Sequence, residues 1–344
     1  MHKTATLTAA IASILAATAS AAEPWSVETP TTQAKAPHVL VIYDMEGLAG
    51  QDDVDSFVPS NPAYAKGQRL LTDDVNAVVD GLFAGGASAV SVADGHGGSA
   101  QIDILTQELD RRAKMVDRWH SSADNYAAVA IVGMHASSGS GGFAAHTWTA
   151  GVEFAINGQA LNEAQLIALT HGEHGIPLIF VSGDDRLGAE MRSLPWVRYV
   201  EVKKATGLES AELYPLKQTR EKMRSGAADA LRGLPQARVI KATRPVAVTV
   251  TAFSPASLSW LADMPGIQYR DQAVSFTAPD AEAAYKGMQA IGTAAMYGYS
   301  DALFRALQKH PDAKRIELDA VAEWDEKWAT SERERAKARG NDRY

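Results

Sequence analysis

Runs of hydrophobic residues alternate with helix-length spacers over the first half of the chain. Four continuous apolar runs, rich in β-branched residues, have the pattern of strands that are buried on both faces. The spacers carry apolar residues at helical spacing, and the Gly85-Gly86 pair marks the end of the first predicted helix. Helix-length spacers between buried strands indicate crossover connections and a mainly parallel sheet. We expect strands at 38–43, 87–93, 127–132 and 177–181, and helices at 67–83, 101–112 and 161–170.

The second half of the chain has a different pattern. Residues 205–234 are polar and helical, residues 245–253 form a new β-rich run, and residues 281–307 have a helical pattern. We therefore predict that residues 244–309 form a smaller α+β part, which packs on the α/β part formed by the first half of the chain. The predicted fold class is α/β, a Rossmann-like three-layer arrangement of a mainly parallel sheet flanked by helices, with a second, smaller α+β domain.

The N-terminal residues have the pattern of a secretory signal. Lys3 precedes an apolar stretch at residues 7–17, and Ala19-Ser20-Ala21 has the small residues of a cleavage site. The alternative is an N-terminal anchor helix, but the apolar stretch is short for a bilayer. We therefore expect a periplasmic or secreted protein.

The chain as a whole is predicted to have five parts. These are a signal peptide at 1–22, an exposed leader at 23–36, a metal-binding catalytic domain at 37–235, the smaller domain at 236–310 and a charged tail at 311–344. We interpret the tail as a solvated helix that frays.

The composition limits which binding partners and which metal-ligating side chains the protein can have. The 344 residues are 46% hydrophobic and carry a net charge of -8, which is ordinary for a globular protein and argues against a nucleic-acid partner. No later segment is apolar for long enough to cross a membrane, so the mature form is expected to have no membrane span. The chain has no cysteine, so any metal site must use His, Asp and Glu, which suits zinc or manganese in an open catalytic site.

Polar side chains follow three of the predicted strands at the point where each strand ends. The first strand runs into Asp44-Met45-Glu46-Gly47, the second into Asp94-Gly95-His96 and the third into Gly133-Met134-His135. Ligands of open parallel sheets bind beyond these carboxyl ends. Two close carboxylates repel each other unless a positive charge lies between them. Two imidazoles beside them make a divalent-metal cluster the economical hypothesis.

Four further residues have weaker local signals. Glu163 opens a predicted helix after the Asn157-Gly158 turn, which a first-turn acid favoured by the helix dipole would also explain. His146 lies in a loop after a flexible Ser/Gly segment and could reach into a cleft. Asp184 and Asp185 follow the fourth strand, either orienting ligands from behind or simply forming a turn.

These residues as a set resemble a known family, the bacterial zinc-dependent D-aminopeptidases of the dipeptide-transport operon type. The resemblance covers roughly residues 39–307 and implies two zinc ions per chain, with Asp44 bridging them and His146 as the catalytic histidine. It also implies a small peptide substrate and a large homo-oligomer, such as a decameric ring. The residues that carry the resemblance are the Asp44-to-Gly47 motif, His96, His135, His146, Asn157-Gly158, Glu163 and Gly183-Asp184-Asp185, and the implied metal ligands are Asp44, Glu46, His96, His135 and Glu163.

The sequence thus predicts an exported dinuclear zinc aminopeptidase that cleaves short peptides with an N-terminal D-amino acid such as D-Ala. His146 would act as a general base, a nucleophile or an oxyanion donor. D-stereospecificity follows from the resemblance alone. Two other classes stay open from the residues: another dinuclear hydrolase, such as an amidase or phosphoesterase, and a non-catalytic periplasmic protein that binds peptides or metal.

Overall fold

A seven-stranded sheet forms the centre of the main body. The computed structural model describes residues 23–30, 36–59, 61–97, 102–117, 126–265 and 267–338, so the predicted signal peptide lies outside the described residues. The sheet has the order β10-β9-β8-β5-β2-β3-β4, and all its pairs are parallel except β9 with β10. Its strands are β2 (His38–Tyr43), β3 (Ala89–Asp94), β4 (Ala113–Val116), β5 (Ala128–Val132), β8 (Leu178–Asp184), β9 (Arg198–Gly207) and β10 (Ser210–Leu213).

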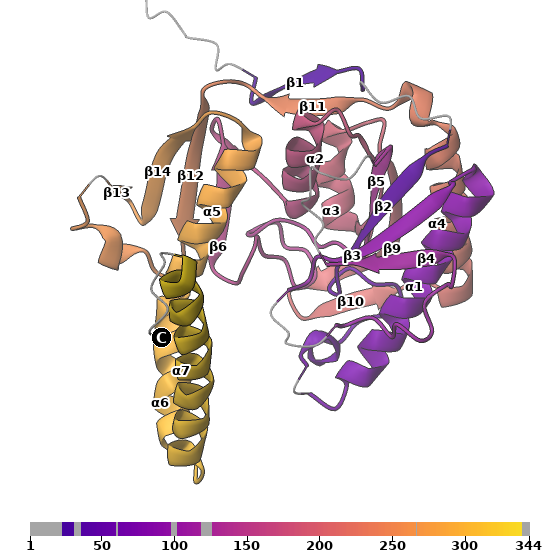
Figure 1. Ribbon diagram of the computed structural model, residues 1–344. Coiled ribbons are helices and arrows are strands. Elements are labelled where there is room, and N and C mark those ends of the chain that lie inside the picture. Colours follow the sequence, from indigo (N-terminus) through magenta and orange to yellow (C-terminus); the bar gives the residue numbers. More distant parts are fainter. Residues whose placement is uncertain are drawn as a thin grey trace, which may run out of the picture.

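Helices cover both faces of this sheet, which makes the main body three-layered (Figure 1). Successive residues of a strand point to opposite faces. Val39 and Val41 belong to one buried cluster with apolar residues of α1 and α4, whereas Leu40 and Ile42 belong to a second cluster with those of α2. The predicted fold class is therefore confirmed. The flanking helices are α1 (Tyr64–Gly85), α2 (Glu163–Glu173), α3 (Asp185–Glu190) and α4 (Leu216–Arg232).

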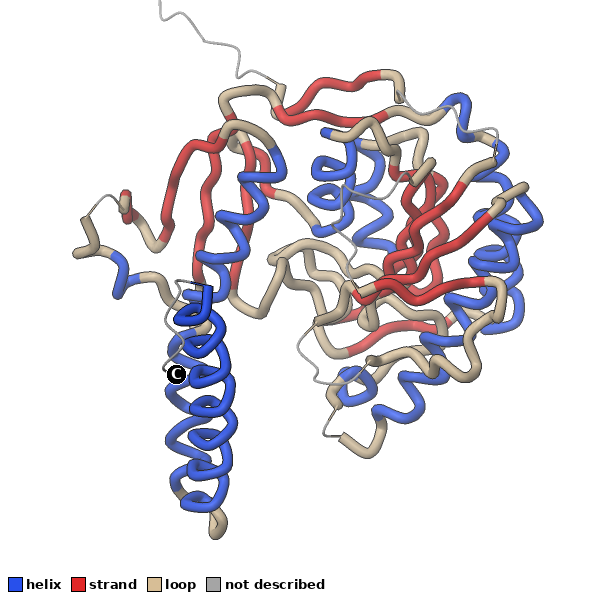
Figure 2. Tube along the Cα trace, in the orientation of Figure 1, coloured by secondary structure: helices blue, strands red, loops and turns tan. Residues whose placement is uncertain are grey.

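A second sheet lies beside the main body, as the tube view in Figure 2 shows. It is antiparallel with the order β13-β14-β12-β6-β7, and α5 packs against it. Because β6 and β7 come from before α2, this sheet is not built from the C-terminal part alone, and the predicted boundary at residue 235 does not separate the two sheets. The elements are β6 (Val152–Ile156), β7 (Gln159–Ala160), β12 (Val246–Ala252), β13 (Gln268–Arg270), β14 (Ala273–Ala278) and α5 (Ala281–Ala295).

Several local predictions need correction. Residues 102–112 form turns and no helix, because their backbone hydrogen bonds go partly to side chains of α1. The predicted leader contains β1 (Trp25–Glu28), which pairs with β11 (Val239–Ala242). The helix expected at 281–307 is divided at Met296.

The C-terminal residues extend away from both sheets. Helices α6 (Tyr297–Gln308) and α7 (Ala313–Ala338) lie side by side as a hairpin that projects from the body (Figure 1). None of the helices within the described ranges combines the length and apolar character needed to cross a membrane.

One buried ion pair joins α1 to α4. Arg220 Nε of α4 donates to Asp74 Oδ1 of α1 at 2.8 Å, and the Asp74 side chain is fully buried. The second oxygen of Asp74 accepts from Ala49 N at 2.8 Å. Burial raises the pKa of Asp74 to about 6, although Arg220 opposes that rise. The carboxylate is therefore ionised at neutral pH and depends on Arg220 for compensation.

We expect Arg220→Ala to cost about 3–5 kcal/mol of unfolding free energy at pH 8, because it leaves a buried carboxylate without its partner. The loss should be smaller at pH 5, where Asp74 can take up a proton in the folded state. Arg224→Ala is the matched control, since Arg224 lies on the same helix and pairs with the exposed Asp80; it should cost about 0–1 kcal/mol. Urea unfolding at both pH values measures the difference, and equal losses in the two variants would contradict the prediction.

Candidate metal centre and active site

Three parallel strands end at one level and deliver their following residues to one place. The register pairs Tyr43 of β2 with Asp94 of β3 and with Val132 of β5. Asp44, His96 and His135 therefore leave the same edge of the sheet. After β3 and β4 on one side of β2, the chain returns to β5 on the other side, so this edge is the topological switch point of the sheet.

Close backbone contacts hold the loops after β2 and β5 together. Asp44 N donates to Val132 O at 2.8 Å, and Gly47 N donates to Gly133 O at 2.6 Å. A Cβ atom on Gly47 would lie 2.0 Å from Met134 O, so only glycine fits there. Gly133 has φ +77, a conformation that other residues rarely adopt, and a Cβ atom there would lie 2.3 Å from Asp44 O. These glycines explain how Glu46 and His135 come to lie near each other.

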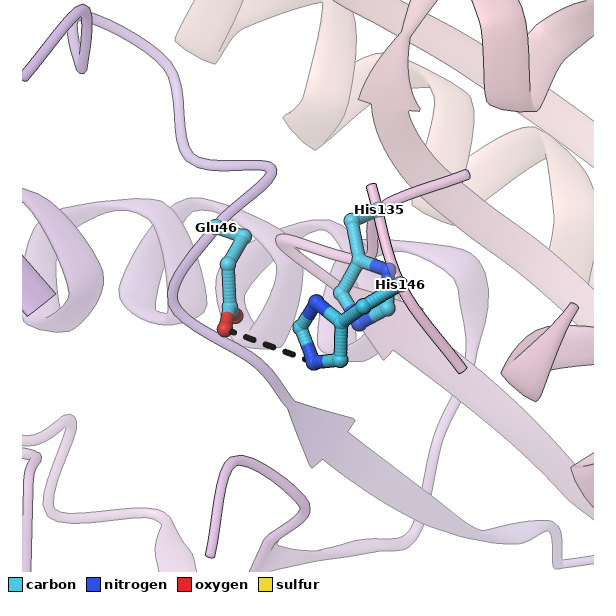
Figure 3. A group of neighbouring side chains, drawn as sticks. All are labelled: Glu46, His135 and His146. Atoms are coloured by element: carbon cyan, nitrogen blue, oxygen red, sulfur yellow. Dashed lines mark ion pairs between the residues drawn. The ribbon is translucent and has the colours of Figure 1, made fainter. Parts of the chain in front are cut away.

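The segment between β5 and α2 supplies the remaining predicted residues. The ring of His146 stacks on that of His135, with centroids 3.9 Å apart, and its Nε2 lies 3.9 Å from Glu46 Oε1 (Figure 3). Glu163 is the first residue of α2, after a capping box in which Asn162 and Gln165 each receive a hydrogen bond from the other's backbone. Trp148 N donates to Glu163 Oε1 at 2.7 Å and thereby fixes that carboxylate.

All six predicted site residues lie together. Asp44, Glu46 and His96 form one group whose potential ligand atoms lie within 4.8 Å of one another, and Asp44, His135 and Glu163 form a second. Asp44 is shared by the two groups. His146 meets the same distance limit with Glu46 and His135, so geometry alone leaves a ligand role open to it.

Buried charge of both signs dominates the electrostatics. Burial and the neighbouring Glu46 carboxylate raise the pKa of Asp44. Burial lowers the pKa of His96, but Glu46 and Asp103 outweigh it and raise this pKa to about 10. Burial also lowers the pKa of His135, and Glu163 and Asp44 more than reverse that effect. The carboxylates thus favour a positive charge at this place, which a divalent cation held by the same groups would also supply.

The cluster opens into a cavity of about 750 Å³, which is lined mainly by loops at this edge of the seven-stranded sheet and by Thr293 and Met296 at the end of α5. Carboxylates and imidazoles lie on one wall, and Trp148, Leu208 and Met296 contribute apolar surface elsewhere. A cavity that combines this charged cluster with apolar surface suits a small substrate. The apolar surface can bind the unreactive part of the substrate, and the reactive group can face the cluster.

Two buried residues behind the cluster were not identified from the sequence. Asp103 lies behind His96, with Asp103 Oδ2 and His96 Nδ1 3.0 Å apart. Lys203 of β9 is fully buried, donates to Glu46 O at 2.6 Å and to Gln51 O at 3.0 Å, and lies over the Phe143 ring. Neither had a recognisable signal, because Asp103 lies in a segment predicted as helix and a lysine in a strand is usually exposed.

The remaining polar residues from the sequence have structural contacts. Asp184 caps α3 and also accepts from Phe143 N at 2.8 Å, which anchors the loop that carries His146. Asp185 accepts from Ala205 N at 2.7 Å. Both lie behind the site as turn and cap residues. His171 Nδ1 lies 3.0 Å from Ile167 O of its own helix, so it has no part in the cluster.

Comparison with known proteins gives a consistent family. A sequence profile described as D-aminopeptidase matches residues 38–290. The D-aminopeptidase of Bacillus subtilis (strain 168) is 25% identical over 265 residues, which cover 74% of this chain and 96% of that protein. The solved structure of the Zn-dependent D-aminopeptidase DppA from Bacillus subtilis, described as a self-compartmentalizing protease, superposes with a TM-score of 0.70. It shares 23% identity, and the match covers 76% of this chain and 98% of that one.

Proposed function

The chain belongs to the D-aminopeptidase family, and from that membership we propose that it is an exported dinuclear zinc aminopeptidase. Its substrates are short peptides whose N-terminal residue is a D-amino acid such as D-Ala. The observation that carries the dinuclear assignment is the sharing of Asp44 between two groups of potential ligands.

The donor set fits two zinc ions. Two buried carboxylates and the partly buried Glu163 cannot all be ionised at such short separations without positive charge between them. Asp44, Glu46 and His96 would hold one ion, and Asp44, His135 and Glu163 the other, with donors of the types that zinc prefers. When bound, such a pair supplies Lewis acidity and acidifies water near neutral pH.

The chain's own residues perform the other parts of the reaction. The cavity holds the peptide so that its first carbonyl faces the cluster, while Trp148, Leu208 and Met296 offer apolar surface to the rest of the substrate. His146, with Nδ1 2.8 Å from Ala144 O, presents Nε2 toward Glu46 and the cavity. There it can accept or donate the proton that moves between water and the departing amine.

Peptide turnover tests this proposal. With added zinc, the protein should release D-Ala from D-Ala-D-Ala and D-Ala-Gly-Gly, with kcat/KM at least about tenfold above that for the L-Ala counterparts, since a misplaced methyl group costs roughly 1–3 kcal/mol in a fitted pocket. p-Nitrophenyl phosphate serves as the phosphoesterase control. Equal turnover of D and L peptides would contradict the stereospecificity, and turnover of the phosphate ester alone would contradict the peptidase assignment.

We also propose export to the periplasm or beyond, on the basis of Lys3, the apolar stretch and Ala19-Ser20-Ala21. N-terminal sequencing of protein from the cell envelope should then begin near Ala22 or Glu23. An intact Met1 on protein from the cytoplasmic fraction would contradict export.

Homo-oligomerisation is a further part of the proposal, with a decameric ring as the expected form. The description of the DppA structure as a self-compartmentalizing protease supports it.

A further inference from the structure

A buried chain of hydrogen bonds lies directly behind His96. Asp103 is fully buried, and its Oδ2 lies 3.0 Å from His96 Nδ1. The other oxygen of Asp103 accepts a hydrogen bond from the hydroxyl of Tyr64, the first residue of α1. Gln68 Nε2, one turn further along α1, donates to the Asp103 backbone oxygen at 2.9 Å. Both carboxylate oxygens are therefore in use, and α1 fixes the position of Asp103.

This arrangement determines which nitrogen of the ring faces the site. In a neutral imidazole whose Nδ1 faces a carboxylate, Nδ1 carries the proton and Nε2 keeps a lone pair that a metal ion can accept. Nε2 of His96 lies 3.6 Å from Glu46 Oε1, on the side of the ring where the proposed ligands gather. A negative charge behind a ligating histidine also makes that histidine a stronger donor.

The second predicted ligand histidine, His135, has a different hydrogen-bond partner at its Nδ1. His135 Nδ1 lies 3.0 Å from the backbone oxygen of Ala136, the next residue, and so faces a neutral acceptor. Each of the two groups that share Asp44 contains one histidine. Among the described residues, His96 has a buried carboxylate at its Nδ1, whereas His135 has a backbone oxygen there.

We propose that Asp103, held by Tyr64, is a positioning residue that sets the zinc affinity of the Asp44–Glu46–His96 position and leaves the Asp44–His135–Glu163 position unaffected. This inference rests on the proposed function, because it assumes that both positions bind zinc. It assigns unequal roles to two positions that have the same number and types of donors, and it predicts that they can be weakened separately.

Zinc titration of Asp103→Ala against a chromophoric chelator tests the proposal on the full-length protein. One of the two ions should bind 10- to 100-fold more weakly, the usual effect of removing such a partner, while the affinity for the other stays the same. Asp103→Asn keeps an acceptor oxygen without the charge and should give an intermediate loss. Tyr64→Phe removes one hydrogen bond to the carboxylate and should weaken the same ion on the order of 2- to 10-fold.

The control variant changes an aspartate of the same loop that lies away from the site. Asp110 pairs with Arg112 at the surface, so Asp110→Ala should bind both ions as the wild type does. The ring nitrogen chemical shifts of His96 in the zinc-loaded protein give a second measurement, because loss of the Asp103 partner should change the Nδ1 signal and leave that of His135 in place. If Asp103→Ala does not fold, Tyr64→Phe tests the same carboxylate with a smaller change.

Two results would overturn the inference. The first is unchanged affinity for both ions in Asp103→Ala or, where only it folds, in Tyr64→Phe. The second is an equal loss at both positions, which would indicate general loosening of the site. A wild-type protein that binds no zinc would instead contradict the proposed function itself, so the two failures can be told apart.

Discussion

Asp44→Ala is expected to remove zinc from both positions and to abolish turnover. Asp44 is the residue that the two groups of potential ligands share, and it is buried between them. Its removal should reduce the zinc content from about two ions per chain to well below one. The loss in kcat/KM should be on the order of 10³-fold or more, since stabilisation by the metal is worth several kcal/mol.

Glu46→Ala provides the comparison within the cluster. Glu46 and His96 share one group with Asp44, so this variant should lose about one ion and retain the one at His135 and Glu163. Asp52→Ala changes an exposed carboxylate of the same loop, which lies 3.8 Å from Lys66 Nζ and outside both groups of potential ligands, and it should keep both ions and full activity. Elemental analysis after dialysis measures all three variants. Asp44→Ala protein that still holds two zinc ions would rule out the bridging role.

The position of the cluster could be predicted from the sequence because it depends on local rules. Buried strands are visible as apolar runs, and the residues that follow parallel strands meet at one edge of the sheet. The strand that leads to Asp44 was predicted with the bounds that the structure has, and those leading to His96 and His135 within two residues. His146 and Glu163 needed the family resemblance, since a loop histidine and a first-turn acid have no distinctive local pattern.

The parts that could not be predicted depend on tertiary contacts. β6 joins β12, about ninety residues later in the chain, and its alternation of buried and partly buried residues is too short to assign it to either sheet. The loop around Asp103 is held by side chains of α1, so its helical sequence pattern did not produce a helix. Lys203 is buried next to a shift in strand register after Gly183, which changes which residues of β9 face inward.

His146→Ala is expected to keep its zinc and lose most of its turnover. The two groups that share Asp44 are complete without His146. Its ring stacks on that of His135 (Figure 3). Its side chain is 23% exposed and lines the cavity where a peptide would bind. Loss of a general base or an oxyanion donor typically reduces kcat on the order of 10²- to 10⁴-fold. His135→Ala should instead lose zinc and turnover together.

Zinc content and D-alanyl peptide turnover, measured on the same two preparations, separate the possible roles. His146 also lies within ligand distance of Glu46 and His135, so the result does not follow from geometry alone. Loss of zinc in His146→Ala, as in His135→Ala, would make His146 a ligand. If His146→Ala kept both its zinc and its turnover, His146 would have no part in the reaction, and the proton would have to pass through Glu46, Glu163 or water at the metal site. Retained zinc with a large loss in kcat is the one result that assigns His146 to the reaction itself, because stacking on His135 alone would affect metal binding first.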